Sequence, residues 1–441
     1  MPKKKTALTI EERLQQALVP AEEQPYEVPE NWVWVRLGAV CYASKEKSND
    51  FSNEIKYIGL EHLEKDKGIV GFSSADKVKS TKNAFQEGQI LYGRLRPYLN
   101  KHDIASFSGV CSTDILVFEA SVLVANVLVD KFFNLPFFIE YVVANSKGIN
   151  LPRVSEKTIL NTTFPLPPLS EQQRIVERIE ELFTKLDEAK ERLQEVAESF
   201  AVRKAAILHK AFTGELIGKQ VTELVPLENL VDLIKIGPFG SSLHESDYIE
   251  NGIPLVNPKH IVQQRIVPQS KISISDEKAE ELSSYKLKEN DIVLGRRGEM
   301  GRCAPISNRE ENWICGTGSM IIRLKKEYDA KLYSLILGSQ ATVTYLENSA
   351  VGSTLKNLNE KIVRKIPVPQ FSSEEQHEIV RLIDDLLARE RSAQQATEQA
   401  LASIDLMKKS ILARAFRGEL GTNKASEASA LELLRQVLAE G

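Results

Sequence analysis

Two basic loops contain the side chains most suited to binding a ligand. The first follows Gly93 and contains Arg94, Arg96, Tyr98, Asn100, Lys101 and His102; the second follows Gly295 and contains Arg296, Arg297 and Arg302. Arginine donates two parallel hydrogen bonds to a guanine edge or a phosphate, and asparagine can bind adenine in the same way. A single basic glycine loop is usually a solvated turn. Because two such loops each follow an expected strand, the pattern favours DNA contact.

A third candidate is the loop at 236–243, which reads IGPFGSSL. Its two glycines and the hydroxyls of Ser241 and Ser242 could hold a phosphate, helped by backbone N–H groups. A tight turn with Phe239 in the core explains the pattern equally well. Lys259 and His260 follow the next expected strand, and we expect Lys259 to lie on the same face.

Motifs for catalysis are missing from the sequence. The four cysteines lie far apart, with spacing that fits neither a zinc site nor a disulfide framework. No G-x-x-x-x-G-K-[ST] loop occurs. Asn257-Pro258-Lys259 lacks the second proline and the aromatic residue of an amino-methylation motif, and we find no convincing nuclease carboxylate cluster. We therefore expect no catalytic residue, no bound metal and no cofactor, and we expect Cys111 and Cys315 to be small buried core residues.

The chain contains an internal duplication, which determines how its elements are arranged. Residues 207–216 read ILHKAFTGEL and residues 411–420 read ILARAFRGEL, so that Phe212 and Phe416 are 204 positions apart. A repeat of this length indicates two domain copies rather than a solenoid. Each half is expected to be a globular domain followed by a long helix.

Both long helices carry an apolar stripe with heptad spacing. The first stripe is interrupted at Arg203, and the second has the polar residues Glu390 and Thr397 in its middle. The stripe positions are Ile175, Ile179, Leu182, Leu186, Ala189, Leu193, Val196, Phe200 and Ile207, then Ile379, Ile383, Leu386, Ala393, Ala400, Ile404, Met407 and Ile411. Ser170 with Gln173, and Ser373 with Gln376, have capping-box spacing. Gly214 and Gly418 stand where a glycine would end each helix.

A helix with one apolar stripe must pack against something. At about 1.5 Å per residue each helix would be roughly 60 Å long. We predict that the two helices form an antiparallel pair, with the larger Leu193 and Val196 matched to the smaller Thr397 and Ala400. In the alternative, each stripe packs on its own domain.

The globular domains are expected to be α/β or mixed β. Strands are predicted at 32–37, 89–92, 114–118, 291–294 and 319–324, and helices at 137–145 and 335–346. The net charge of −4 and pI of about 6.0 argue against a free-standing nonspecific nucleic-acid binder. No transmembrane segment or signal peptide is expected, and the cysteine usage is typical of the reducing cytoplasm.

The two ends of the chain each predict a short amphipathic helix. Thr9 with Glu12 begins one, which continues through Leu14, and Ser429 with Glu432 begins the other. The sequence leaves open whether these helices pack at the ends of the helix pair, bind a partner protein or are frayed.

With these motifs identified, the chain resembles the specificity subunits of Type I restriction-modification systems over nearly its whole length. The matching segments are PENWVWVRLG at 29–38, GRLRPYL at 93–99, GPFGS at 237–241, and PLPPLSEQQRIV at 165–176 with its second copy. Each motif is weak by itself, and together they are specific. The resemblance implies an α+β fold in which two target-recognition domains are separated by a pair of long helices.

The resemblance also implies a division of labour among partners. Each recognition domain would read one half of a split double-stranded DNA site. The helices would bind two methyltransferase subunits, which recruit ATP-driven restriction subunits. S-adenosylmethionine, ATP and magnesium would then belong to the partners. The helix pair would act as a ruler for the spacer between half-sites.

This interpretation divides the chain into six parts. The two globular domains are residues 26–165 and 218–368, and each is followed by a long helix, at 166–217 and 369–421. Residues 1–25 form an N-terminal helix and linker, and residues 422–441 form a C-terminal helix and tail. Two rival hypotheses remain. A stand-alone methyltransferase or nuclease is disfavoured by the missing motifs. A coiled-coil scaffold without DNA specificity would fit the acidic pI but leaves the two basic loops unexplained.

Overall fold

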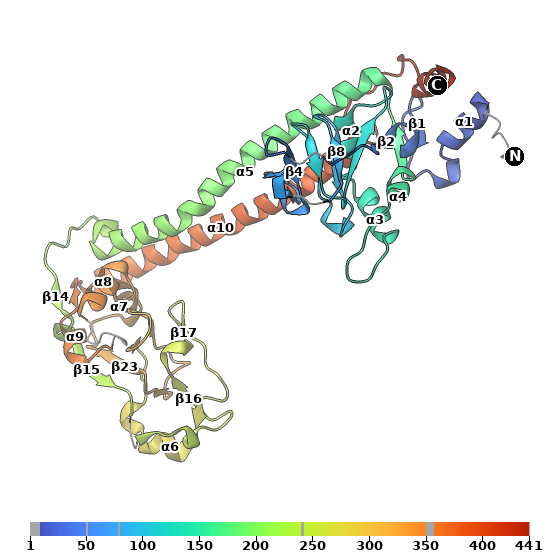
Figure 1. Cartoon of the computed structure of the whole chain (residues 1–441). Coiled ribbons are helices and arrows are strands. Elements are labelled where there is room, and N and C mark those ends of the chain that lie inside the picture. Colours follow the sequence, from blue (N-terminus) through green and yellow to red (C-terminus); the bar gives the residue numbers. More distant parts are fainter. Residues whose placement is uncertain (1–8, 50–51, 78–79, 240–241, 350–356, 441) are drawn as a thin grey trace. The chain divides into compact units, whose positions relative to one another are not determined.

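The computed structural model describes residues 9–49, 52–77, 80–239, 242–349 and 357–440, and it divides the chain into two compact units (Figure 1). Unit 1 consists of residues 1–193 and 399–441, and unit 2 consists of residues 194–398. Each unit therefore combines one globular domain with part of both long helices. Among the described residues, no helix has the length and apolar character needed to cross a membrane.

Unit 1 is built on a four-stranded antiparallel sheet of order β10-β9-β12-β2, formed by His102–Ile104, Ile90–Gly93, Ile115–Ala120 and Cys41–Ala43. A second sheet has the order β3-β8-β11-β4-β7, with bounds Lys47–Ser48, Lys82–Phe85, Gly109–Cys111, Lys56–Ile58 and Ser73–Ser74. Strands β4 and β11 are parallel, and the other pairs are antiparallel. Strand β1 (Val33–Arg36) pairs with β13 (Thr163–Leu166), and β5 (Leu63–Glu64) pairs with β6 (Gly68–Ile69).

Successive residues of a strand point to opposite faces, and β9 separates two cores in this way. Tyr92 packs with the helices α2 (Asn126–Phe132), α3 (Pro136–Ala144) and α4 (Glu156–Leu160) on one side, in a core rich in phenylalanine. Leu91 contributes to the core on the other side. Because both faces are covered, β9 is buried along its whole length.

Unit 2 repeats this plan. Its main sheet has the order β15-β23-β20-β21, formed by Val231–Ile236, Ser319–Leu324, Asp291–Gly295 and Cys303–Pro305. The second sheet is β19-β16-β22, formed by Ser273–Ile274, Ile253–Val256 and Ile314–Cys315, and β16 and β22 are parallel like β4 and β11. Two further strand pairs are β14 (Val225–Pro226) with β24 (Pro367–Val368), and β17 (Ile261–Val262) with β18 (Arg265–Ile266). The helices of the domain are α6 (Asp276–Glu281), α7 (Ala330–Leu337), α8 (Gln340–Ser349) and α9 (Glu360–Arg364).

The expected fold class, two α/β domains and two long helices, is confirmed, and strands lie at all five predicted positions. One predicted helix was wrong in detail. Residues 335–346 span the end of α7 and the start of α8, because the chain turns at Gly338 between them. Burial of Cys111 and Cys315 is confirmed.

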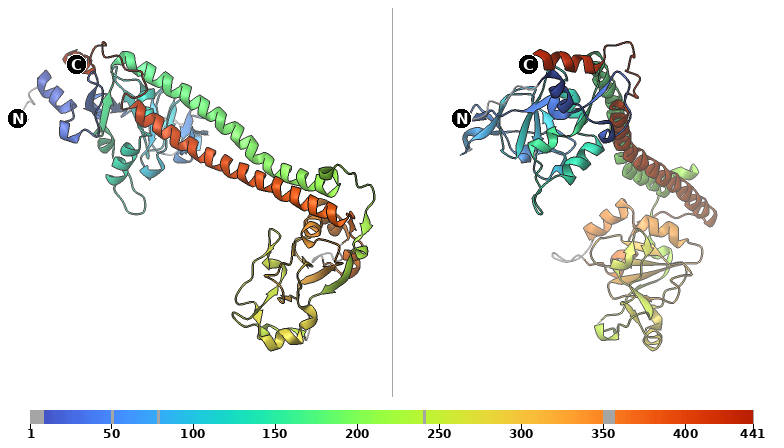
Figure 2. Two further views of the ribbon diagram at one scale, coloured as in Figure 1. Left: turned by 180° about the vertical axis from the view of Figure 1, so that it is seen from behind. Right: turned by 90° about the vertical axis from the view of Figure 1, so that its right-hand side faces the viewer.

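The long helices α5 (Leu169–Phe212) and α10 (Ser373–Ala415) run alongside each other (Figures 1 and 2). In unit 1, Lys190 forms an ion pair with Asp405 at 3.4 Å. In unit 2, Arg203 is paired with Glu390. In unit 1 a second pair joins Asp187 to Lys408, so the residue number falls along α5 as it rises along α10. The predicted antiparallel pairing is therefore confirmed.

The apolar stripes are less continuous than predicted. Ile175, Ile179 and Phe200 are buried, but Val196 is 42% exposed and Met407 is 51% exposed. Val196 therefore lies at the edge of the helix seam, whereas the smaller Thr397 is buried, and the predicted match of larger to smaller residues stays a prediction.

The helix starts also differ from the prediction. Helix α5 begins at Leu169, so Ser170 already lies inside it. Before α10, Ser372 rather than Ser373 forms a capping box, because its Oγ accepts from the N–H of Glu375 and its N–H donates to the Glu375 carboxylate. Gly214 and Gly418 follow the helices with φ values of 83° and 74°, as expected for glycines that end a helix.

Two glutamines instead attach the helix starts to the domains. Gln172 accepts from the N–H of Ala125 and donates to the carbonyl of Leu123. Its counterpart Gln376 accepts from the N–H of Asp329 and donates to the carbonyl of Glu327. The start of each long helix is thus held by the same side chain in both copies.

Both predicted terminal helices exist, as α1 (Ile10–Ala17) and α11 (Ala430–Glu440). Thr9 and Glu12 form the predicted capping box of α1. Leu14 of α1 and Leu434 of α11 are buried in the core of unit 1, and Arg13 donates a hydrogen bond to the carbonyl of Leu438. The terminal helices therefore pack against unit 1.

Candidate nucleic-acid interface

The two basic loops leave their strands in the same way. At the end of β9, the N–H of Gly93 donates to the carbonyl of Lys101 at 2.8 Å, and the N–H of Arg94 donates to the carbonyl of Asp114 at 2.9 Å. At the end of β20, the corresponding bonds are Gly295 to Arg302 at 2.8 Å and Arg296 to Gly318 at 2.9 Å. Arg94 and Arg296, and likewise Lys101 and Arg302, therefore occupy equivalent backbone positions.

The first loop contains two residues in the left-handed backbone region. Arg96 has a φ of 52° and Asn100 a φ of 42°, a conformation that non-glycine residues rarely adopt. The side chains of Arg96 and Tyr98 are exposed in this loop, and that of Tyr98 is 51% exposed. Backbone strain of this kind is concentrated at ligand-binding sites in proteins.

Asn100 and His102 are buried, which corrects the expectation that they touch DNA directly. The Nδ1 atom of His102 lies 2.6 Å from Asp130, and its Nε2 lies 3.2 Å from both Asn100 and Asn134. The imidazole is stacked on the ring of Tyr92. This network fixes the end of the loop inside the domain, so we assign these two residues a positioning role.

Burial also limits the two equivalent arginines. The Nε atom of Arg94 is buried without a hydrogen-bond partner among the described residues, and Nε of Arg296 donates to the carbonyl of Leu358. Burial and the neighbouring charge of Arg297 lower the pKa of Arg296. The guanidinium nevertheless stays charged at neutral pH. Each of these arginines is half-buried and partly structural, whereas Arg297 is exposed.

Lys101 and Arg302 each bind a turn from the second sheet. The Nζ of Lys101 donates to the carbonyl of Leu60 at 2.9 Å, and Nη1 of Arg302 lies 3.4 Å from the carbonyl of Pro258. Arg302 is also ion-paired with Glu299. Sequence reasoning missed the turn Leu60–His62, whereas it singled out Lys259 and His260 of the second turn, Pro258–His260. Their shared signal is a histidine four residues after the end of a short strand.

The glycine loop after β15 is only partly described. Ser241 lies outside the described residues, and Ser242 is exposed. Phe239 is 67% exposed, so the alternative that places its ring in the core is wrong. Gly237 lies against the backbone of Gly316, where a Cβ would come within 2.0 Å of the Gly316 carbonyl oxygen. Lys259 is exposed on the turn after β16.

Two ionisable groups in the described part of unit 1 are held by burial or by pairing. Burial raises the pKa of the Cys111 thiol to about 12, so this group stays protonated. Asp114 accepts two hydrogen bonds from Arg153, which lower the pKa of the carboxyl group. Within the described ranges, no group of three or more His, Cys, Asp or Glu side chains is placed to hold a metal ion.

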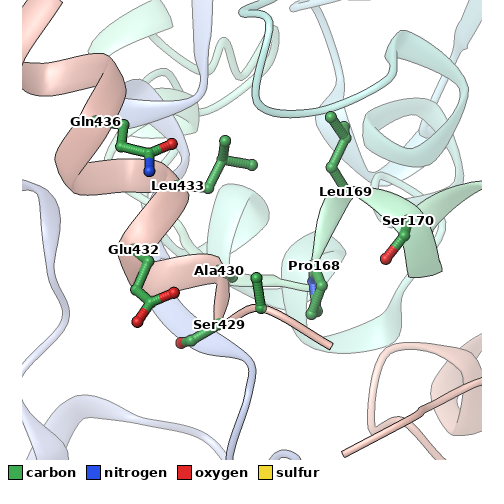
Figure 3. Close-up of a pocket in the computed structure, with 9 residues that line it drawn as sticks. Pro168, Leu169, Ser170, Ser429, Ala430, Glu432, Leu433 and Gln436 are labelled. Carbon is green, nitrogen blue, oxygen red and sulfur yellow. The ribbon is translucent and has the colours of Figure 1, made fainter. Parts of the chain in front are cut away.

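A groove of about 460 Å³ lies in unit 1, between the start of α11 and the start of α5 (Figure 3). Its lining includes Leu169, Ser170, Ser429, Leu433 and Gln436. Among the described lining residues there is no lysine or arginine, so the groove differs in chemistry from the strand-end loops.

Comparison with known proteins agrees with the duplicated structure. A family model, the Type I restriction modification DNA specificity domain, matches residues 29–198 and 228–401. The chain is 29% identical over 335 residues to the Type I restriction enzyme EcoBI specificity subunit of Escherichia coli, covering 69% of this chain and 70% of that protein. It is 25% identical over 317 residues to the EcoKI specificity subunit of Escherichia coli strain K12, covering 67% of each.

A solved structure supports the fold. The HsdS subunit from Thermoanaerobacter tengcongensis superimposes with a TM-score of 0.67 at 22% identity, covering 90% of this chain and 99% of that one. Two family matches, one per unit, also account for the internal repeat. The chain belongs to the family of Type I restriction-modification DNA specificity subunits, which are non-catalytic members of their complexes.

Proposed function

We propose that each globular domain, 26–165 and 218–368, reads one half of a bipartite site on double-stranded DNA. The observation that carries this proposal is the equivalence of the two strand-end loops. The backbone frame is the same in both, and a basic residue stands at equivalent positions. The exposed side chains differ, with Arg96 and Tyr98 in one loop and Arg297 in the other. Such a pair of loops fits two sites of one kind with different targets.

The helix pair, 166–217 with 369–421, fixes the spacer between the half-sites and binds two methyltransferase subunits, through which restriction subunits join. In support of a docking role, the long helices carry exposed apolar side chains, among them Val202 at 70% and Leu406 at 66% exposure. S-adenosylmethionine, ATP and magnesium are bound by those partner subunits. The assembled complex acts in the cytoplasm, and residues 1–25 and 422–441 are end segments of the first domain.

Mapping of methylated bases tests this proposal. The chain is co-expressed with its methyltransferase subunit, and modified adenines are located on genomic DNA. We expect a bipartite motif with one fixed spacer. The variant Arg96→Asn should relax only one half-site and Arg297→Ala only the other, so each variant is the control for its partner. Asparagine is chosen at 96 because it tolerates the left-handed backbone. Each lost base contact is worth about 1–3 kcal/mol of discrimination.

Three results would contradict the proposal. A motif with variable spacing would remove the ruler function. Relaxation of both half-sites by one variant would mean that the domains do not read separate halves. Methylation that is absent or has no motif would favour the scaffold hypothesis.

A further inference from the structure

A short turn beside each strand-end loop is duplicated even where the loops differ. The turn Leu60–His62 follows β4, and the turn Pro258–His260 follows β16. In the first, the Nδ1 atom of His62 lies 3.0 Å from the backbone nitrogen of Gly59. In the second, Nδ1 of His260 lies 3.2 Å from the backbone nitrogen of Asn257 and 2.8 Å from the carbonyl oxygen of Leu255. In each turn the histidine ring therefore lies against the backbone nitrogen of the residue that precedes the turn.

Each turn is also fastened to its surroundings at equivalent atoms. Its first carbonyl, that of Leu60 or Pro258, faces the basic side chain of Lys101 or Arg302, as described above. Its last carbonyl, that of the histidine, accepts a backbone hydrogen bond from Val70 at 2.9 Å in unit 1 and from Val267 at 2.8 Å in unit 2. These contacts hold the backbone of both turns in one orientation beside the basic loop.

The central residue of the turn is held by none of these contacts, and it differs between the copies. It is Glu61 in unit 1 and Lys259 in unit 2, and both side chains are exposed. The glycine at 59 leaves room for the acidic side chain, because a Cβ there would lie 2.3 Å from Oε1 of Glu61. The same backbone position thus presents opposite charges from two equivalent frames.

The sign of the charge indicates what each residue contacts. A carboxylate beside DNA is repelled by the phosphates, so an acid next to a basic loop costs affinity unless it accepts a hydrogen bond from a base. Glutamate accepts from the N4 amino group of cytosine in the major groove. Lysine donates to O6 and N7 of guanine. An acid at a reading position also rejects bases that offer it only acceptors.

We propose that Glu61 and Lys259 are base-reading residues at equivalent positions of the two half-sites. This inference rests on the proposed DNA-reading function of the domains. Glu61 selects cytosine in the half-site of unit 1, and Lys259 selects guanine in the half-site of unit 2. His62 and His260 are positioning residues that hold the turn.

The test exchanges the charges and maps the methylated motif in the full complex. Glu61→Lys should shift the preference at one position of one half-site from cytosine to guanine by roughly tenfold to a hundredfold, leaving the other half-site and the spacer unchanged. Lys259→Glu should produce the reverse shift in the other half-site. Glu87→Lys and Lys288→Glu are matched controls, because these exposed residues lie just before β9 and β20, at the strand ends opposite the loops. Neither control should alter the motif.

The outcomes separate this inference from the proposed function. If the wild type and Arg96→Asn behave as proposed but Glu61→Lys leaves the motif unchanged, the turn does not read bases and the inference is overturned. Equal loss of methylation at all sites would also overturn it, since phosphate contacts act that way. If Glu61→Lys does not assemble, Glu61→Gln replaces it and should relax the cytosine preference; an unchanged motif then overturns the inference. If the wild-type complex methylates DNA without any sequence motif, the proposed function and this inference are overturned together.

Discussion

Several equivalent residues of the two domains fall into two classes. The buried and half-buried ones that hold the backbone are identical, whereas the exposed ones differ. Arg94 and Arg296 are identical, half-buried and bonded through the same backbone atoms. Cys111 and Cys315 are identical and fully enclosed. Glu61 and Lys259 differ and are exposed. Within this one chain, the two domain copies therefore share these buried structural residues and differ in exposed ones.

At the residue scale, His260 is expected to make unit 2 sensitive to acid. Its side chain is buried, and burial, together with the charge of Lys259, lowers its pKa below the ordinary value. In the unfolded chain a histidine takes up a proton near pH 6.5, which the folded chain resists. Stability contributed by neutral His260 is therefore present above about pH 6.5 and is lost as pH falls below it.

The measurement is thermal unfolding between pH 8 and pH 5 for the wild type and for His260→Gln. The variant should be less stable at pH 8 but should lose less stability on acidification. An identical pH dependence in both proteins would show that His260 does not contribute to it.

At the scale of elements, two of the three polar interruptions of the helix stripes are partners. Arg203 is the residue that breaks the first stripe, and Glu390 breaks the second. In unit 2, Nε of Arg203 lies 3.1 and 3.0 Å from the two carboxylate oxygens of Glu390. A matched polar pair on an apolar seam fixes the register of two helices, because a shifted register leaves both charges unpaired.

We expect Arg203→Leu and Glu390→Leu each to destabilise the chain, and the double variant to recover much of the loss. A double-mutant cycle should give a coupling free energy of about 1 kcal/mol for this partly buried pair. The exposed pair Lys190 with Asp405 is the matched control and should couple by less than about 0.5 kcal/mol. Equal coupling in both pairs, measured by denaturant unfolding, would contradict a special role for Arg203 and Glu390.

At the scale of the whole molecule, unit 1 joins segments from both ends of the chain around Glu171. This buried carboxylate accepts hydrogen bonds from the Trp32 indole at 2.7 Å, the Asn423 amide at 2.8 Å and the Thr422 hydroxyl at 3.0 Å. The duplicated counterpart Glu375 is paired with Lys219 at 2.6 Å and is partly exposed. The same helix position is therefore an internal hub in unit 1 and a surface contact in unit 2.

Glu171→Ala should destabilise unit 1 by about 2–4 kcal/mol, because three donors lose their buried acceptor. Glu375→Ala, the matched change, removes the ion pair with Lys219 and half of the capping box with Ser372, and should cost about 1 kcal/mol. Limited proteolysis with thermal unfolding measures both, and in Glu171→Ala the tail beyond residue 421 should be cleaved first. Equal losses in the two variants, or a protected tail, would argue against the hub.

Much of this protein was determined by the sequence alone. The duplication follows from matching segments 204 residues apart. The two long helices, five of the strands and the absence of catalytic motifs follow from local patterns, because periodicity and motif spacing are properties of neighbouring residues. The basic composition of the two loops was equally visible. Arg203 and Glu390 were recognised as interruptions of the stripes.

Only the tertiary structure decided which of these residues belong together. Arg203 and Glu390 are far apart in sequence, and a stripe indicates a face without naming its partner. Asn100 and His102 look like surface groups in a basic loop, but Asp130 and Asn134, on a helix and just after it, draw them inside. The turns at Glu61 and Lys259 share almost no side chains, so their equivalence emerges from backbone contacts that form only when distant strands pair.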